Sequence, residues 1–144
     1  MRAWPWRTGR WISWRRRWFM SEVETILATV QGYFDALYEG DVEKFRRVFH
    51  AGAQLFTAED GATEALDLDS YMTRVRNRAS PASRGDARLD EVIGVTLASP
   101  TTAHVRVRTA LGSKRFQDEL LLVRYADGWR IACKAWAYDP LRGA

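Results

Sequence analysis

One acidic side chain of this sequence stands where a carboxylate could take part in chemistry. Asp118 lies in the segment KRFQDELLLVRY, whose alternating apolar residues predict a strand. If Gly112-Ser113 forms a two-residue hairpin turn, Val107 of the preceding strand lies opposite Asp118 on an otherwise apolar face. A carboxylate desolvated there could act as a general base near neutral pH. It could equally be a structural acid that accepts hydrogen bonds inside the core.

Two tyrosines could complete a site around this carboxylate. Tyr33 and Tyr71 could donate hydrogen bonds to the carbonyl oxygen of a ligand, or they could be core residues whose hydroxyls reach the rim of a pocket. A second two-residue turn at Asp127-Gly128 would place Ala135 on the inner face of the sheet. Small residues there would leave a cavity between the sheet and the helices. The residues expected to line it are Tyr33, Tyr71, Phe116, Asp118, Cys133 and Ala135.

The opposite face of the same strands has the composition of a protein interface. The register pairs Arg106 with Glu119 and places Glu119 beside Trp136, so that an aromatic side chain flanks a cross-strand ion pair. Exposed aromatic residues surrounded by charges are typical of the core and rim of an interface. We therefore expect a homodimer whose interface contains Arg106, Glu119, Lys134, Trp136 and Tyr138.

The elements that must position these residues follow from the periodicity of the chain. Ser21 and Glu24 match a capping box, which predicts a helix that begins just after Ser21 and ends at Gly40. The order of helices first and the large sheet last predicts an α+β fold, with helices packed on one face of a curved, mostly antiparallel sheet. Further helices are predicted over residues 42–49 and 68–79, and strands over 53–58, 64–68, 88–99, 102–111, 114–125 and 129–138.

The composition excludes several classes of site. A length of 144 residues allows one domain with a sizeable core. Cys133 is the only cysteine, which rules out an internal disulfide and a cysteine-rich zinc site, and the two histidines have no further ligand at metal-binding spacing. Phosphate-loop, dinucleotide and serine-hydrolase motifs are absent from the sequence. We expect no metal, no cofactor, no membrane contact by the folded domain and a cytoplasmic location.

The first 20 residues differ in composition from the rest of the chain. MRAWPWRTGRWISWRRRWFM contains five of the seven tryptophans, six arginines and no acid. Subtracting those six charges from the total of +4 leaves −2 for the other residues, so we expect no nucleic-acid binding by the body of the protein. The segment could lie on an anionic membrane, contact nucleic acid, or lie upstream of a true start at Met20. We favour the last of these three interpretations. We expect an extension over residues 1–20, disordered or not translated, a domain over 21–140 and a tail over 141–144.

Several strings, taken with the order of the elements, resemble a known superfamily. YFDALYEGDVEKFRRVFH, the loop SPASRG, and FQDELLLVRYADGWRIACKAW followed by AYD resemble the nuclear-transport-factor-2-like superfamily and its bacterial lumazine-binding branch. The resemblance covers residues 22–139 and implies a cone-shaped roll of three N-terminal helices on a strongly bent sheet, with a pocket at the wide end. Members include steroid isomerases, dehydratases and polyketide cyclases beside proteins that only bind a ligand or dimerise, so this fold does not decide the function.

The sequence departs from the superfamily pattern at one informative place. Many members carry a Pro-Asp pair after the string that ends in Phe49-His50, and this chain has Ala51 and Gly52 there, so the commonest catalytic carboxylate is missing. Our leading hypothesis is a protein that binds a small hydrophobic ligand in an apolar pocket. The second is an isomerase, dehydratase or cyclase that uses Asp118 as general base on a hydrophobic carbonyl compound. The third is an interaction module that acts through the outer face of the sheet.

Overall fold

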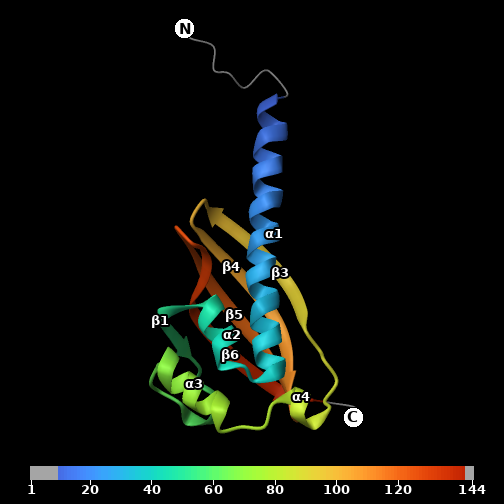
Figure 1. Ribbon diagram of the computed structural model, residues 1–144, viewed down its shortest axis with the longest axis vertical. Coiled ribbons are helices and arrows are strands. Elements are labelled where there is room, and N and C mark those ends of the chain that lie inside the picture. Colours follow the sequence, from blue (N-terminus) through green and yellow to red (C-terminus); the bar gives the residue numbers. More distant parts are fainter. Residues whose placement is uncertain (1–9, 142–144) are drawn as a thin grey trace.

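The described part of the chain begins with one long helix. The computed structural model describes residues 10–141, and in it α1 runs without a break from Arg10 to Glu39. The predicted start just after Ser21 is therefore wrong. Residues 10–20 contain neither Gly nor Pro, so nothing in them prevents the helix from extending past the capping box. The first turns of α1 project beyond the sheet (Figure 1). A domain boundary at residue 20 stays a prediction, and residues 1–9 lie outside the described residues.

Three shorter helices follow, namely α2 (Val42–Val48), α3 (Leu68–Arg76) and α4 (Pro81–Arg84), with a 3-10 turn, η1, at Glu59–Gly61. Each helix begins at a side chain that caps its free backbone N–H groups. Asp41 accepts a hydrogen bond from the first turn of α2, and Asp67 does so for α3. α4 lies where the sequence suggests a loop. Ser80 caps it and Pro81 takes its first position, where a missing N–H costs nothing.

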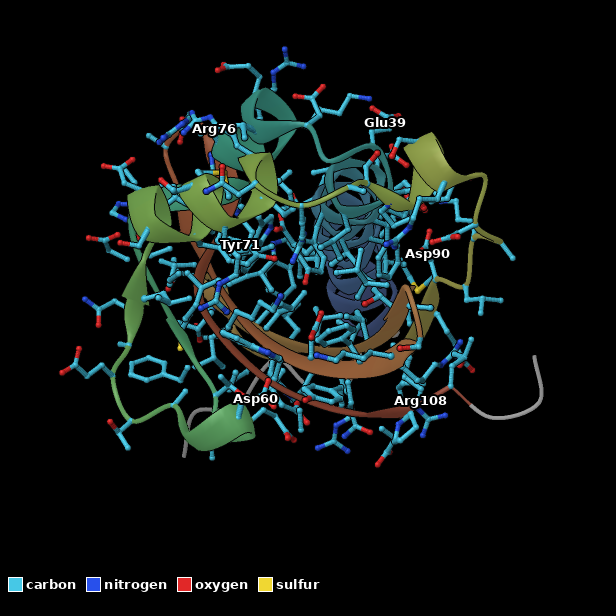
Figure 2. The ribbon with its side chains drawn as sticks, turned by 90° about the horizontal axis from the view of Figure 1, so that it is seen from below. Glu39, Asp60, Tyr71, Arg76, Asp90 and Arg108 are labelled. Carbon is cyan, nitrogen blue, oxygen red and sulfur yellow. The ribbon has the colours of Figure 1, made fainter. Side chains whose placement is uncertain are left out.

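Six strands form a single curved sheet, namely β1 (Phe49–Phe56), β2 (Leu66–Asp67), β3 (Glu91–Ser99), β4 (Thr102–Leu111), β5 (Lys114–Tyr125) and β6 (Gly128–Pro140). Their order is β2-β1-β6-β5-β4-β3, and every neighbouring pair is antiparallel except β1 and β6. The predicted α+β fold with a C-terminal antiparallel meander is thus confirmed. Figure 2 looks along α1 and shows the sheet bending around this helix, with α3 lying across the open side of the curve.

The register of β4 against β5 agrees with the register counted from the sequence. The turn between the strands is Gly112-Ser113, and Gly112 has a φ of 59°, which suits the first central position of a tight hairpin turn. As predicted, Val107 pairs with Asp118. The inner, concave face of the sheet is therefore assigned correctly on these two strands.

The register of β5 against β6 differs from the prediction, with consequences for the site. The turn is Ala126-Asp127, one residue earlier than expected, and Ala132 is an extra residue that forms a β-bulge. Beyond the bulge each residue of β6 is shifted by one against its predicted partner, so that Lys134 rather than Ala135 lies opposite Leu120. Because a shift by one residue reverses the faces of a strand, Lys134 moves to the inner face.

The core lies between α1 and the concave face of the sheet. Ile26, Val30 and Tyr33 of α1 are fully buried, while Leu27, which helical spacing places on the same face, is more than one third exposed. Phe45 of α2 contacts Tyr33 edge to face at a centroid distance of 6.2 Å. These contacts fix the end of α1 that carries Tyr33 above the sheet residues that form the candidate site.

Candidate functional site

The centre of the core contains an oppositely charged pair. Asp118 of β5 is 1% exposed and Lys134 of β6 is 4% exposed, and the Lys134 Nζ lies 3.8 Å from the Asp118 Oδ2. Alternation along β5 places Asp118 on the inner face, and the bulge in β6 turns Lys134 to the same face. Isolated charges are costly to bury, so each group makes the burial of the other tolerable.

Tyr33 is the hydrogen-bond donor to this carboxylate. Its hydroxyl donates to the Asp118 Oδ2 over 2.6 Å, and the phenol ring is completely buried. Burial and, next in importance, the negative charge of Asp118 raise the pKa of Tyr33 well above its ordinary value, and the positive charge of Arg78 acts in the opposite direction. The phenol is therefore a permanent proton donor over the physiological pH range.

Three aromatic rings surround the ammonium group of Lys134. Its Nζ lies 5.4 Å from the centre of the Tyr33 ring, 5.0 Å from that of Tyr71 and 5.1 Å from that of Trp136. Such distances are typical of cation–π contacts, which are stronger in a desolvated site. The Nζ also donates a hydrogen bond of 3.3 Å to the Tyr71 hydroxyl. The cluster of Tyr33, Tyr71, Asp118 and Lys134 thus links α1, α3, β5 and β6.

A small cavity borders this cluster between α3 and the sheet. Its volume is about 30 Å³, which is room for roughly two water molecules. The polar lining comes from the charged pair, Tyr71 of α3, Thr109 of β4 and Arg78, which follows α3. The apolar lining is made by Leu37, Ala110, Leu111 and Phe116. Arg78 and Leu111 are among the half-buried lining residues, so part of each side chain is accessible to solvent.

One oxygen of the buried carboxylate has no partner. Among the described residues, Asp118 Oδ1 is the buried side-chain polar atom that lacks a hydrogen bond. A buried acceptor without a donor costs about 1–3 kcal/mol, and native proteins rarely leave one unsatisfied. Since Asp118 lines the cavity, a donor brought by a bound molecule would remove this cost.

The structure brings together only part of the predicted pocket. Tyr71, Phe116 and Asp118 line the cavity, and Tyr33 lies behind Asp118 as its hydrogen-bond donor. Cys133 and Ala135 do not line it, because the bulge turns both to the outer face of β6. Burial raises the pKa of the Cys133 thiol, which disfavours the reactive thiolate.

Two lining residues, Lys134 and Arg78, are not among the pocket residues predicted from the sequence. The register counted from the predicted hairpin turn places Lys134 on the outer face, and no pattern in the sequence predicts the bulge that moves it to the inner face. Arg78 resembles the solvated arginines around α3. Its guanidinium lies over the ring of Tyr71, 5.9 Å from the ring centre, and this contact depends on where α3 ends.

The outer, convex face of the sheet keeps part of the predicted interface. Arg106 and Glu119 pair across β4 and β5 as expected, and His104 also contacts the Glu119 carboxylate. Burial alone would raise the pKa of Glu119, but hydrogen bonds from His104 and Arg106 lower it. Leu121 is 50% exposed beside this ion pair and is a further interface candidate that the sequence does not single out. The prediction that Lys134 belongs to this face is wrong, since its side chain is buried inside.

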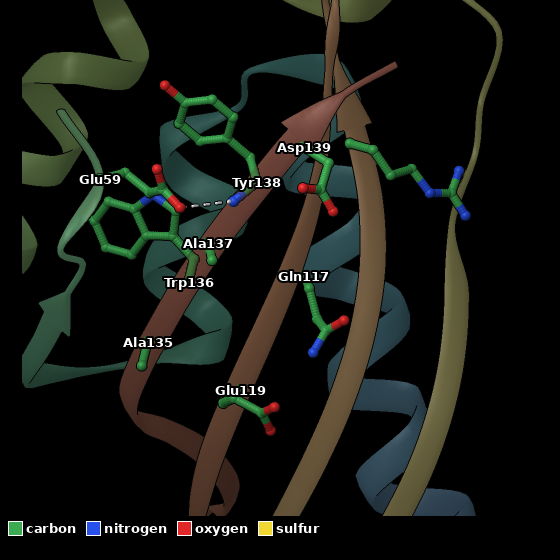
Figure 3. A pocket seen from close by; sticks show the side chains of 9 residues that line it. Glu59, Gln117, Glu119, Ala135, Trp136, Ala137, Tyr138 and Asp139 are labelled. Carbon is green, nitrogen blue, oxygen red and sulfur yellow. Dashed lines mark hydrogen bonds between the residues drawn. The ribbon is translucent and has the colours of Figure 1, made fainter. Parts of the chain in front are cut away.

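The predicted outer-face positions of Trp136 and Tyr138 are also wrong, because beyond the bulge these residues pair with Asp118 and Phe116 on the inner side of β6, and they border an outer hollow only at its edge. Figure 3 shows Trp136 and Tyr138 turned towards Glu59, whose carboxylate accepts a hydrogen bond from the Tyr138 amide. The hollow has a volume of about 380 Å³, and Gln117 and Glu119 of β5 form part of its floor. It lies on the face opposite the Asp118 carboxylate, so the two cavities are separate sites.

The described residues provide neither a metal-binding cluster nor a membrane-spanning helix. Among residues 10–141, no three His, Cys, Asp or Glu side chains come close enough together to hold a metal ion. In the same part of the chain, no helix combines the length and the apolar character that crossing a membrane requires.

Solved structures identify the class of fold. An NTF2-like protein of unknown function from Silicibacter pomeroyi is 20% identical, with a TM-score of 0.76 over 84% of this chain and 98% of that one. One from Shewanella baltica is 18% identical, with a TM-score of 0.75 over 85% and 97% of the two chains. A ketosteroid isomerase-like protein from Erwinia carotovora atroseptica is 17% identical, with a TM-score of 0.64 over 81% and 95%. The chain has the nuclear-transport-factor-2-like fold.

A match of the sequence to a family model identifies the family. Residues 21–137 match the model of the family described as "Putative lumazine-binding". The chain belongs to this lumazine-binding branch of the NTF2-like superfamily, as the local strings indicated. No curated protein matches the chain significantly. The likeness to solved structures, at 20% identity or below, concerns the fold and leaves the activity to be argued from the site.

Proposed function

We propose that this protein binds a small molecule in the cavity between α3 and the inner face of the sheet, in contact with Asp118. The observation that carries this proposal is that Asp118, a residue that lines the cavity, has a buried acceptor, Oδ1, without a donor among the described residues. The lining is less apolar than the sequence suggests, because Lys134 stands where Ala135 is expected. The ligand is therefore held by polar groups at one end and by Leu37, Leu111 and Phe116 around it.

The size of the cavity limits the part of the ligand that it encloses. A volume of about 30 Å³ is far below the roughly 300–1,000 Å³ of sites for drug-sized ligands. A larger ligand would have to displace the half-buried side chains of Arg78 and Leu111. We expect a small polar group to enter beside Asp118 while the rest of the ligand replaces these side chains at the mouth.

Native mass spectrometry of the full chain, purified without denaturation, tests the proposal. We expect a bound mass on the wild type and on the matched control Glu119→Gln, which changes the neighbouring carboxylate on the opposite face. Asp118→Asn should lose most of it. If that variant does not fold, Leu111→Trp serves instead, because Leu111 is on the inner face of β4 and a larger side chain there fills the cavity without altering a charge. No bound mass on the wild type, or an equal bound mass on all variants, would contradict the proposal.

A second candidate is an isomerase, dehydratase or cyclase in which Asp118 accepts a proton from a carbonyl compound. The observation that favours it is that Tyr33 and Lys134 both engage Oδ2, which leaves Oδ1 for a substrate. Incubating the co-purified compound with wild type and with Asp118→Asn tests this activity. Conversion by the wild type alone supports the enzyme, and recovery of unchanged compound from both leaves binding as the function.

We also propose that two copies associate through the outer face of the sheet in the cytoplasm. The exposed Leu121 lies beside the Arg106–Glu119 pair, which gives an apolar centre with a charged rim. Leu121→Arg should convert a dimer to a monomer in light scattering coupled to size-exclusion chromatography, while Arg74→Gln, at an exposed position of α3, should not. A wild type that is monomeric at high micromolar concentration would rule out the homodimer, and capture of a different protein on this face would favour an interaction module.

A further inference from the structure

The formal charges of the side chains around the inner cavity do not cancel. Asp118 supplies one negative charge, and Lys134 and Arg78 supply two positive charges. Lys134 lies 3.8 Å from the Asp118 carboxylate, whereas no carboxylate among residues 10–141 forms an ion pair with Arg78. Arg78 instead lies over the ring of Tyr71. The mouth of the cavity therefore carries one positive charge that the described residues leave uncompensated.

The buried ammonium group also has unused hydrogen-bond donors. An ammonium carries three N–H groups, and Lys134 makes one hydrogen bond among the described residues, of 3.3 Å, to the Tyr71 hydroxyl. The 3.8 Å separation from Asp118 Oδ2 is beyond the range of a direct hydrogen bond. Its remaining close neighbours are the faces of aromatic rings, which accept no conventional hydrogen bond. Donors on Lys134 and an acceptor on Asp118 are thus both unused at one cavity.

We infer that the ligand of this cavity is a small hydroxycarboxylate, whose carboxylate contacts Lys134 and Arg78 and whose hydroxyl donates to Asp118 Oδ1. This inference rests on the proposed binding function and specifies its ligand. The carboxylate supplies the negative charge that the mouth lacks, in a charge-assisted contact with the guanidinium. The hydroxyl lies between the carboxylate of the ligand and that of Asp118, which reduces their mutual repulsion. A two-carbon or three-carbon acid fits with an outward movement of Arg78.

Three matched probes separate the parts of this inference. Glycolate carries both groups, acetate lacks the hydroxyl, and glycolamide keeps the hydroxyl but replaces the charged carboxylate by a neutral amide. Each is titrated into the full-length protein in a buffer free of carboxylates and phosphate, and backbone amide shifts are followed by NMR. We expect glycolate to bind most tightly and to move the amide signals of Asp118 and Lys134.

The variant that tests the charge is Arg78→Gln, and Arg74→Gln is its control, since Arg74 is an exposed residue of α3, four positions before Arg78, and does not line the cavity. Loss of one charge-assisted contact should raise the dissociation constant of glycolate about tenfold in Arg78→Gln and leave it unchanged in Arg74→Gln.

Four results would overturn the inference. Equal affinity for glycolamide and glycolate removes the case for an anion, and equal affinity for acetate removes the case for the hydroxyl. Equal weakening in both arginine variants means that the anion is attracted only by the general field of the surface. Absence of glycolate binding also overturns the hydroxycarboxylate inference. If native mass spectrometry then finds a neutral compound on the protein, the proposed binding function is supported and only the inference about the ligand is wrong.

Discussion

The buried pair of Asp118 and Lys134 allows one prediction to be worked out in detail. Lys134→Met removes the ammonium and leaves the carboxylate, which is 1% exposed, without its counter-charge. Breaking a buried pair in this way costs about 3–5 kcal/mol in the free energy of unfolding, because an uncompensated charge stays in the core. For a domain of this size the melting temperature should fall by roughly 10–15 °C.

The double variant distinguishes electrostatics from packing. In Asp118→Asn/Lys134→Met no charge is left inside, and the amide oxygen of Asn can still accept the hydrogen bond from Tyr33. We expect it to cost less than either single variant, so that the free energies are strongly non-additive. Urea unfolding followed by circular dichroism gives all three values, and Glu119→Gln on the outer face should change the stability by less than about 1 kcal/mol.

Additive costs of the two single variants would refute this reasoning, since they would mean that the two charges do not interact. A cost below about 1 kcal/mol for Lys134→Met would refute it as well, because that is the range of a solvent-exposed pair.

Three further predictions concern a titration, a hydrogen bond and a backbone conformation. Because the pKa of Tyr33 is raised, the stability that its neutral hydroxyl contributes is complete below about pH 10 and is lost as the pH rises through the folded-state pKa. Ultraviolet titration should show one tyrosine that ionises later than the others and is absent from Tyr33→Phe. A late-ionising tyrosine that remains in Tyr33→Phe would contradict the assignment. Trp129→Phe removes the 2.9 Å hydrogen bond from the indole to the buried Glu22 carboxylate and should cost about 1.5–3 kcal/mol in thermal unfolding, whereas a neutral result would mean that the carboxylate finds water. Gly40→Ala places a Cβ 3.0 Å from Ser80 at a φ of 66° and should cost at least about 1 kcal/mol, so unchanged urea unfolding would contradict a left-handed backbone at this turn.

Much of the fold could be predicted because it depends on local signals. The Gly112-Ser113 turn sets the register of β4 against β5, and alternation along β5 places Asp118 on the inner face. The order of elements is sufficient for the α+β class. The start of α1 could not be predicted, because a capping box at Ser21 only permits a helix to begin there and does not force it to.

The chemistry of the site is harder to predict than the fold. The interior position of Asp118 follows from periodicity, but its partner Lys134 does not, because the register beyond Ala132 depends on a bulge without a Gly or another local signal. The role of Arg78 depends on how α3 packs over the sheet, which is a tertiary contact. The sequence thus locates the carboxylate, but it does not place Lys134 or Arg78 in the predicted pocket.

The bulge at Ala132 determines which side chains of β6 face the inside of the cone. The charge inside the cone depends on this bulge as much as on residue identity, because β6 paired without it would place Cys133 opposite Leu120 and turn Lys134 to the outer face. Relatives that keep these residues but pair β6 without the bulge would present different interiors while their aligned residues look alike. Ligand preference would therefore depend on the pairing of one strand as well as on the side chains that line the cavity.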